Sequence, residues 1–210
     1  MQRKVGTTRM SSRIAKKKKN TYGFTKAETK RFQRHGKLYN AEDKMLKETF
    51  KHLQFMGYMA LRDRYGFGKT RLVRFYKCMQ SVFDEYSADR ITSKQLLTYC
   101  ESKKIDVHKW IRSITQTEKL KLSNVAKYKA NTLQTMKVLD ASILVYGMIS
   151  ASVLKEQFGF SAPEIERFYG HISYYIDSYV RDYLNDDMIN SIMIEECGLD
   201  LYREDGVVNA

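Results

Sequence analysis

The stretch that decides the fold is ALRDRYGFGKTRLVRFY, residues 60–76, because it recurs without gaps as VLKEQFGFSAPEIERFY, residues 153–169. The apolar stripe continues in register beyond both stretches, at helical spacing. Further on, ITSKQLL (91–97) matches LNDDMIN (184–190), and KIDV (104–107) matches GLDL (198–201) after one inserted residue. We interpret this as two tandem copies of one helical unit. Six residues are identical in the main stretch: Leu61, Gly66, Phe67, Arg74, Phe75 and Tyr76, which recur as Leu154, Gly159, Phe160, Arg167, Phe168 and Tyr169.

Each copy predicts a helix, a Gly-Phe elbow, a second helix and a short third helix. The first helix ends at Tyr65 or Phe158, where the following glycine adopts a left-handed conformation. The phenylalanine after it is expected to be buried as a plug, and Gly68 or Ser161 to start the second helix. The third helices are predicted near 93–103 and 186–197, with Thr92 and Asn185 as N-caps. Segment 113–124 is predicted to be a linker, with the next helix starting at Ser123 or Asn124.

Composition predicts an all-α protein, because the chain has one proline and its apolar residues recur at helical spacing. We expect a disordered basic arm at 1–24, a basic repeat at 25–112, the linker 113–124, an acidic repeat at 125–205 and a tail at 206–210. Thr25 to Glu28 fit a capping box, which predicts a helix start near Lys26.

The net charge of +13 is distributed unevenly. Residues 1–40 hold 13 Lys or Arg and one acid, whereas residues 143–205 hold 4 basic and 12 acidic residues. A basic segment poor in apolar residues cannot offset its ordering entropy, but it binds phosphates by releasing counterions. We expect nucleic-acid or ribonucleoprotein contact here, with a solubilising tail as the alternative. The candidate residues are Arg3, Lys4, Arg9, Arg13, Lys16, Lys17, Lys18, Lys19, Lys30 and Arg34.

The letters Gly68-Lys69-Thr70 suggest a phosphate-binding loop, but the rest of that motif is missing. Asp63 stands where the loop needs its first glycine, and a helix precedes the motif where a strand is required. A helix-turn-helix fits the spacing better, although Arg62 occupies a position that is usually small and must extend toward solvent. A plain packing elbow is the other interpretation.

The two copies differ on the surface of the second helix. Copy one exposes a cationic face, predicted to contact phosphates through Lys69, Arg71, Arg74 and Lys77. Copy two carries Glu164 on that face and a tyrosine-rich helix, so Glu164, Tyr174 and Tyr175 are predicted protein-binding residues. Copy two has three candidate partners: the cationic arm, a second copy of the chain, or another basic partner.

No constellation of catalytic or metal-binding residues is visible, so we expect no enzyme, cofactor or metal. His35, His52, His108 and His171 have no partner spacing, and the three cysteines match no metal motif. Trp110 is predicted to be core. We expect neither a secretory signal nor an apolar run of about 18 residues that would span a membrane. The cysteine thiols are expected to be reduced, in the cytoplasm.

YGFGKTRLVRFY (65–76), with the preceding helix and the following Ile105-Asp106, resembles small helical proteins of phages and mobile elements of Gram-positive bacteria, which carry a Y-G-F-G-x-x-R-L-x-R-F-like signature. The resemblance covers about residues 45–112 and, more loosely, 140–202. It implies a mobile-element origin, a bacterial host cell and no enzymatic activity. A basic arm on a compact body also looks like some anti-CRISPR proteins, which act on an RNA-guided nuclease or its guide.

We therefore expect a non-enzymatic protein that binds nucleic acid or a ribonucleoprotein, serving counter-defence or regulation. Its expected partners are RNA or DNA phosphates and, by resemblance, a guide–nuclease complex; a homodimer stays open and a membrane is not expected. A helix-turn-helix transcriptional regulator and a structural adaptor are the alternatives.

Overall fold

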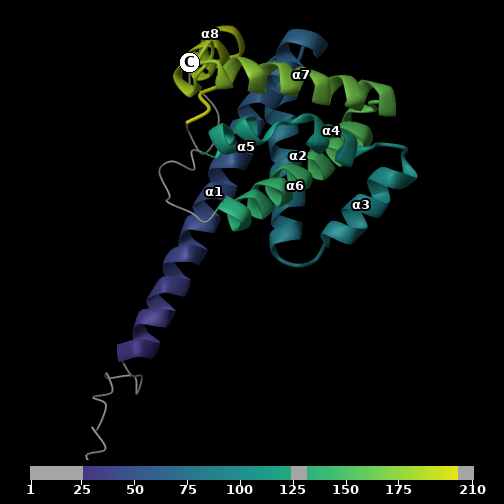
Figure 1. Cartoon of the computed structure of the whole chain (residues 1–210). Helices are drawn as coiled ribbons and strands as arrows, with labels where there is room; N and C mark the ends of the chain where they lie inside the picture. Colours follow the sequence, from purple (N-terminus) through teal and green to yellow (C-terminus); the bar gives the residue numbers. More distant parts are fainter. Residues whose placement is uncertain (1–25, 124–131, 203–210) are drawn as a thin grey trace, which may run out of the picture. The chain divides into compact units, whose positions relative to one another are not determined.

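The computed structural model describes residues 26–123 and 132–202, and the side chains of 44–123 and 135–202. Within these ranges the chain forms eight helices and no strand, so the predicted all-α class is confirmed (Figure 1). The chain divides into two units between Asn40 and Ala41, and the second unit, from Ala41 onward, contains all the described side chains. The predicted arm 1–24 and tail 206–210 lie outside the described residues. The helices are α1 (Lys26–Tyr65), α2 (Lys69–Ser87), α3 (Ser93–Ser102), α4 (Val107–Ser113), α5 (Gln116–Leu122), α6 (Thr132–Phe158), α7 (Ala162–Val180) and α8 (Asp186–Cys197).

Both predicted elbows form as expected. Gly66 follows the last residue of α1 with φ of +62°, and Gly159 follows α6 with φ of +72°. In each elbow the phenylalanine N–H donates to the carbonyl six residues earlier at 3.1 Å, which closes the helix end. Phe67 and Phe160 are both buried, so the plug prediction is confirmed.

The second and third helices begin at the predicted residues. Gly68 is the N-cap of α2 and Ser161 that of α7. Thr92 caps α3 in a full capping box, and the Asn185 side chain accepts from the third residue of α8. These caps supply acceptors for N–H groups that have no partner within the helix.

The connection between the two halves is more helical than predicted. Segment 113–124, expected to be a linker, contains α5, which starts with a capping box between Thr115 and Glu118. Ser123 is the C-cap of α5, so the predicted start of the next helix at Ser123 is wrong, and Asn124 lies outside the described residues. Before α5, the short helix α4 buries Trp110, whose ring stacks on that of Tyr169 with centroids 4.5 Å apart.

Helix α6 lies at the centre of the unit Ala41–Ala210, in contact with α2, α3, α4, α5 and α7 (Figure 1). Its segment Thr135–Phe158 is long and apolar enough to cross a membrane by length and composition, a property the sequence analysis did not expect. However, 67% of its apolar window is buried inside the protein. In this fold the helix therefore serves as the core.

A buried polar cluster ties α1 to α5 and α8. His52 directs Nδ1 to the carbonyl of Leu122 and Nε2 to the carboxylate of Asp186 at 3.2 Å. Lys51 donates to the same carboxylate oxygen at 3.3 Å. Burial raises the pKa of Asp186, but the hydrogen bond from His52 and the charge of Lys51 outweigh burial, so that pKa lies below its ordinary value.

Candidate nucleic-acid interface

Four aromatic rings from the two elbows form a continuous chain. Tyr65 lies 4.8 Å from Phe160, Phe160 lies 6.1 Å from Phe67, and Phe67 lies 5.0 Å from Phe158, measured between ring centroids. The two outer pairs have the same interplanar angle of 41°. Each elbow thus completes its packing with a ring from the other half of the chain.

Two arginines of α2 lie over these rings. The guanidinium carbon of Arg71 is 3.9 Å from the centroid of Phe67, and that of Arg74 is 5.3 Å from the centroid of Phe158. Arg74 also donates from Nη2 to Oε1 of Gln157 at 3.3 Å. Both side chains are exposed. A guanidinium stacked on a ring keeps its edge N–H groups directed outward and loses less freedom when it binds an anion.

Two further arginines lie at the other end of the ring chain. Burial raises the pKa of the Tyr65 hydroxyl, and the neighbouring Arg167 on α7 opposes that rise. Arg64, in the last turn of α1, acts on His171: burial first, then the charges of Arg64 and Arg167, lower the pKa of that imidazole. Cations therefore lie beside both ends of the ring chain.

None of these four arginines forms an ion pair with a described side chain, although hydrogen bonds from Ser161, and then the charge of Arg167, lower the pKa of Glu164. Across residues 44–123 and 135–202, no carboxylate lies within ion-pair distance of Arg64, Arg71, Arg74 or Arg167. Many other cations of the same region are paired. Ion pairs with Asp or Glu hold Lys51, Arg62, Arg90, Lys103, Lys109, Arg112, Lys119, Lys121 and Arg181.

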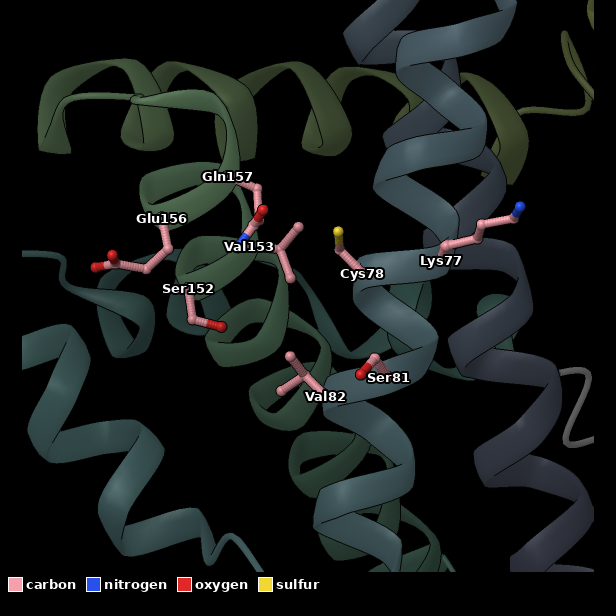
Figure 2. Close-up of a pocket in the computed structure, with 8 residues that line it drawn as sticks. All are labelled: Lys77, Cys78, Ser81, Val82, Ser152, Val153, Glu156 and Gln157. Atoms are coloured by element: carbon pink, nitrogen blue, oxygen red, sulfur yellow. The ribbon is translucent and has the colours of Figure 1, made fainter.

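The structure separates the predicted phosphate-binding residues into groups. Arg71 and Arg74 belong to the elbow, whereas Nζ of Lys69 lies 3.5 Å from where a Cβ on Gly198 would stand, at the end of α8. Lys77 is exposed and is one of the residues that line a groove between α2 and α6, although its amino group points away from α6 (Figure 2). The side chains of Lys30 and Arg34 are not described, and the eight arm residues, Arg3, Lys4, Arg9, Arg13 and Lys16 to Lys19, lie outside the described range.

Sequence reasoning did not include Arg64 and Arg167 among the candidate residues. The repeat itself contained a signal for Arg167, because it aligns with Arg74. No sequence signal placed Arg64, since its position beside His171 depends on the packing of α7 near α1.

The three predicted protein-binding residues have different environments in the structure. Tyr174 is 60% exposed, as a contact residue needs to be. Tyr175 is buried, and its hydroxyl donates to Asp63, so it is not available on the surface as predicted. The Glu164 carboxylate accepts from the backbone N–H and the hydroxyl of Ser161 at the start of α7, which is a capping role.

The cation at the helix-turn-helix position is not directed into solvent. Arg62 is only 17% exposed and pairs with Asp63 at 2.5 Å and with Glu196 on α8 at 3.5 Å. The expectation that it must extend outward is therefore wrong, because two carboxylates compensate its charge within the fold.

A groove of about 430 Å³ lies between α2 and α6, next to Arg74. Figure 2 shows Cys78 and Val82 of α2 facing Val153 of α6 across it, with Gln157 at one end. Gln157 is also the residue that accepts the hydrogen bond from Arg74. The groove therefore adjoins Arg74.

Comparison with known proteins finds no family model that matches the chain, no similar curated protein and no similar solved structure. In the described residues, no three His, Cys, Asp or Glu side chains gather as metal ligands.

Proposed function

We propose that the chain is a nucleic-acid-binding protein whose phosphate contacts centre on Arg64, Arg71, Arg74 and Arg167. The observation that carries the proposal is that these exposed guanidinium groups border one ring chain and have no carboxylate in ion-pair distance within the described region. Phosphate groups are the natural ligands of such a set, because a guanidinium binds them with two parallel hydrogen bonds.

We also infer that the fold is a tandem duplication, with the two halves related by an approximate two-fold axis near the contact of Phe67 with Phe160. In support, the pair Phe67–Phe158 and the pair Tyr65–Phe160 occupy matching positions and have nearly equal geometry. The axis brings Arg74 of one half and Arg167 of the other beside equivalent rings. The duplication thus doubles one cationic element.

In the proposal, the basic arm 1–24 makes phosphate contacts of its own, and the biological setting is the one that the resemblance implies. In that setting, a bacterial host cell, the protein binds RNA, DNA or a guide–nuclease complex. It acts by binding alone, without catalysis. Copy two, through the exposed Tyr174, is the proposed protein-facing side.

The test compares two double variants with equal loss of charge. Arg71→Gln/Arg74→Gln removes two ring-stacked arginines, whereas Lys94→Gln/Lys104→Gln removes two exposed cations of copy one. Affinity for a labelled RNA and a labelled duplex is measured from 50 to 300 mM salt. The arginine variant should reduce the salt slope by about 1.4–1.8, since each lost phosphate contact contributes about 0.7–0.9. Equal weakening by both variants would contradict the assignment of the interface.

Two outcomes would favour the other candidate functions. Tight binding to one duplex sequence, lost in the Arg71→Gln/Arg74→Gln variant, would favour a helix-turn-helix regulator. Absence of any salt-sensitive binding would leave the structural adaptor.

A further inference from the structure

The two halves of the chain differ at one pair of matching positions beside the elbows. Val82 on α2 aligns with Tyr175 on α7, and Glu156 on α6 aligns with Asp63 on α1. In the second half, the Tyr175 ring is buried and its hydroxyl donates to Asp63. The place between α7 and α1 is therefore filled by an aromatic ring of the chain itself.

In the first half the matching place is open. Cys78, Ser81 and Val82 on α2 and Ser152 and Val153 on α6 are small, and between them lies the groove of about 430 Å³ (Figure 2). This volume lies within the roughly 300–1,000 Å³ of sites that hold small molecules. The wall is mostly apolar, so it suits the faces of a planar ring.

The groups at the margin of the groove match a nucleotide. At one end Gln157 joins the groove to Arg74, and Arg71 lies one helical turn further toward the elbow. The Glu156 carboxylate points away from α2 and toward α3 (Figure 2), where it accepts from the Tyr99 hydroxyl and lies 3.9 Å from Lys103.

We propose that the groove between α2 and α6 receives one unstacked nucleobase of single-stranded RNA or DNA, whose phosphates lie on Arg71 and Arg74. The base takes the place that the Tyr175 ring occupies in the other half. A duplex cannot supply it, because its bases are stacked and paired within the helix. The inference rests on the proposed function and narrows its ligand to single strands.

The first test places a tyrosine ring in the groove, as Tyr175 does at the matching place between α7 and α1. Val82→Tyr introduces the ring found at Tyr175, and Gln80→Tyr, at an exposed position of the same helix, is the matched control. Anisotropy titrations use labelled 12-mers of single-stranded RNA, single-stranded DNA and the corresponding DNA duplex at one salt concentration. Val82→Tyr should weaken both single strands by about 5- to 150-fold, the range for the loss of one stacked base, and leave the duplex unchanged. Gln80→Tyr should change neither.

The second test uses the native protein, so it does not depend on the folding of a variant. Cys78 lines the groove and is partly exposed, whereas Cys100 and Cys197 are buried. Saturating single-stranded 12-mer should slow alkylation of Cys78, and saturating duplex should not. A rate that is unchanged by the single strand, or an equal effect of duplex and single strand, would overturn the inference. Absence of binding to all three probes would instead refute the proposed function.

Discussion

Gly57, in the buried part of α1, allows Tyr146 of α6 to pack closely against that helix. This contact predicts how Gly57→Ala changes the stability of the fold. A Cβ added at Gly57 would lie closer than 3.0 Å to the Tyr146 hydroxyl, a distance that real Cβ atoms do not reach. The next nearest atoms, Cζ of Phe168 and Cζ of Tyr146, are both at an ordinary 3.6 Å. Only the hydroxyl oxygen stands in the way of a side chain here.

Two terms of opposite sign decide the effect of Gly57→Ala on stability. Replacing glycine by alanine within a helix stabilises by about 1 kcal/mol. Overpacking a core costs about 1–3 kcal/mol, and Tyr146 is fully buried, so its ring has little room to move. Gly57→Ala should therefore lower the free energy of unfolding by about 1 kcal/mol.

The sign should reverse in a Tyr146→Phe background, where the obstructing oxygen is gone. There Gly57→Ala should raise the free energy of unfolding by about 1 kcal/mol. Tyr146→Phe alone should be neutral or stabilising, because in the described structure its hydroxyl is buried without a hydrogen-bond partner. Urea unfolding of the four proteins measures the cycle. If Gly57→Ala has the same effect in both backgrounds, the contact with Tyr146 is not the cause.

Three further predictions concern titration, capping and backbone conformation. The pKa of Asp186 is lower in the folded chain than in the unfolded one, so the stabilisation from its carboxylate is complete above about pH 4 and is lost as the pH falls through the folded pKa. Asp186→Asn should therefore lower the free energy of unfolding by about 1–3 kcal/mol near neutral pH. In a series of unfolding measurements at different pH, the variant should also depend less on pH in the acid range. Thr92→Ala should cost about 1 kcal/mol in urea unfolding, since it removes the hydrogen bond to Gln95 that begins α3. Gly66→Ala should cost about 1–2 kcal/mol for its left-handed backbone, whereas Gly170→Ala, in open space within α7, should stabilise by about 1 kcal/mol; equal effects of the two would contradict the argument from backbone conformation.

The ends and caps of the helices could be predicted from the sequence because they depend on residues close to one another in the chain. Gly66 and Gly159 end their helices since few other residues tolerate their backbone conformation, and Thr92 and Asn185 cap theirs through groups only three residues away. The helix α5 was missed although its capping box was in the sequence, because its seven residues carry too short a periodicity to be recognised.

The candidate interface could be predicted only in part, because it depends on contacts between halves. Helical spacing correctly predicts that Arg71 and Arg74 are exposed. However, the ring beneath Arg74 is Phe158, from a helix in the other half of the chain. Lys69 has the same exposed register as its neighbours, yet α8 lies beside it. The burial of Tyr175 likewise required knowing that Asp63 of α1 would face it.

The exchange of rings between the two elbows has a consequence for how the chain folds. Helical proteins usually fold fast because their contacts are local in sequence. Here the hydrogen bond from Tyr65 to the carbonyl of Glu164 spans 99 residues, and the bond from Tyr175 to Asp63 spans 112. The first elbow cannot complete its packing during synthesis until the chain as far as Glu164 has left the ribosome. We therefore expect a slow folder for its class, with a single cooperative transition in which neither half holds its native structure alone.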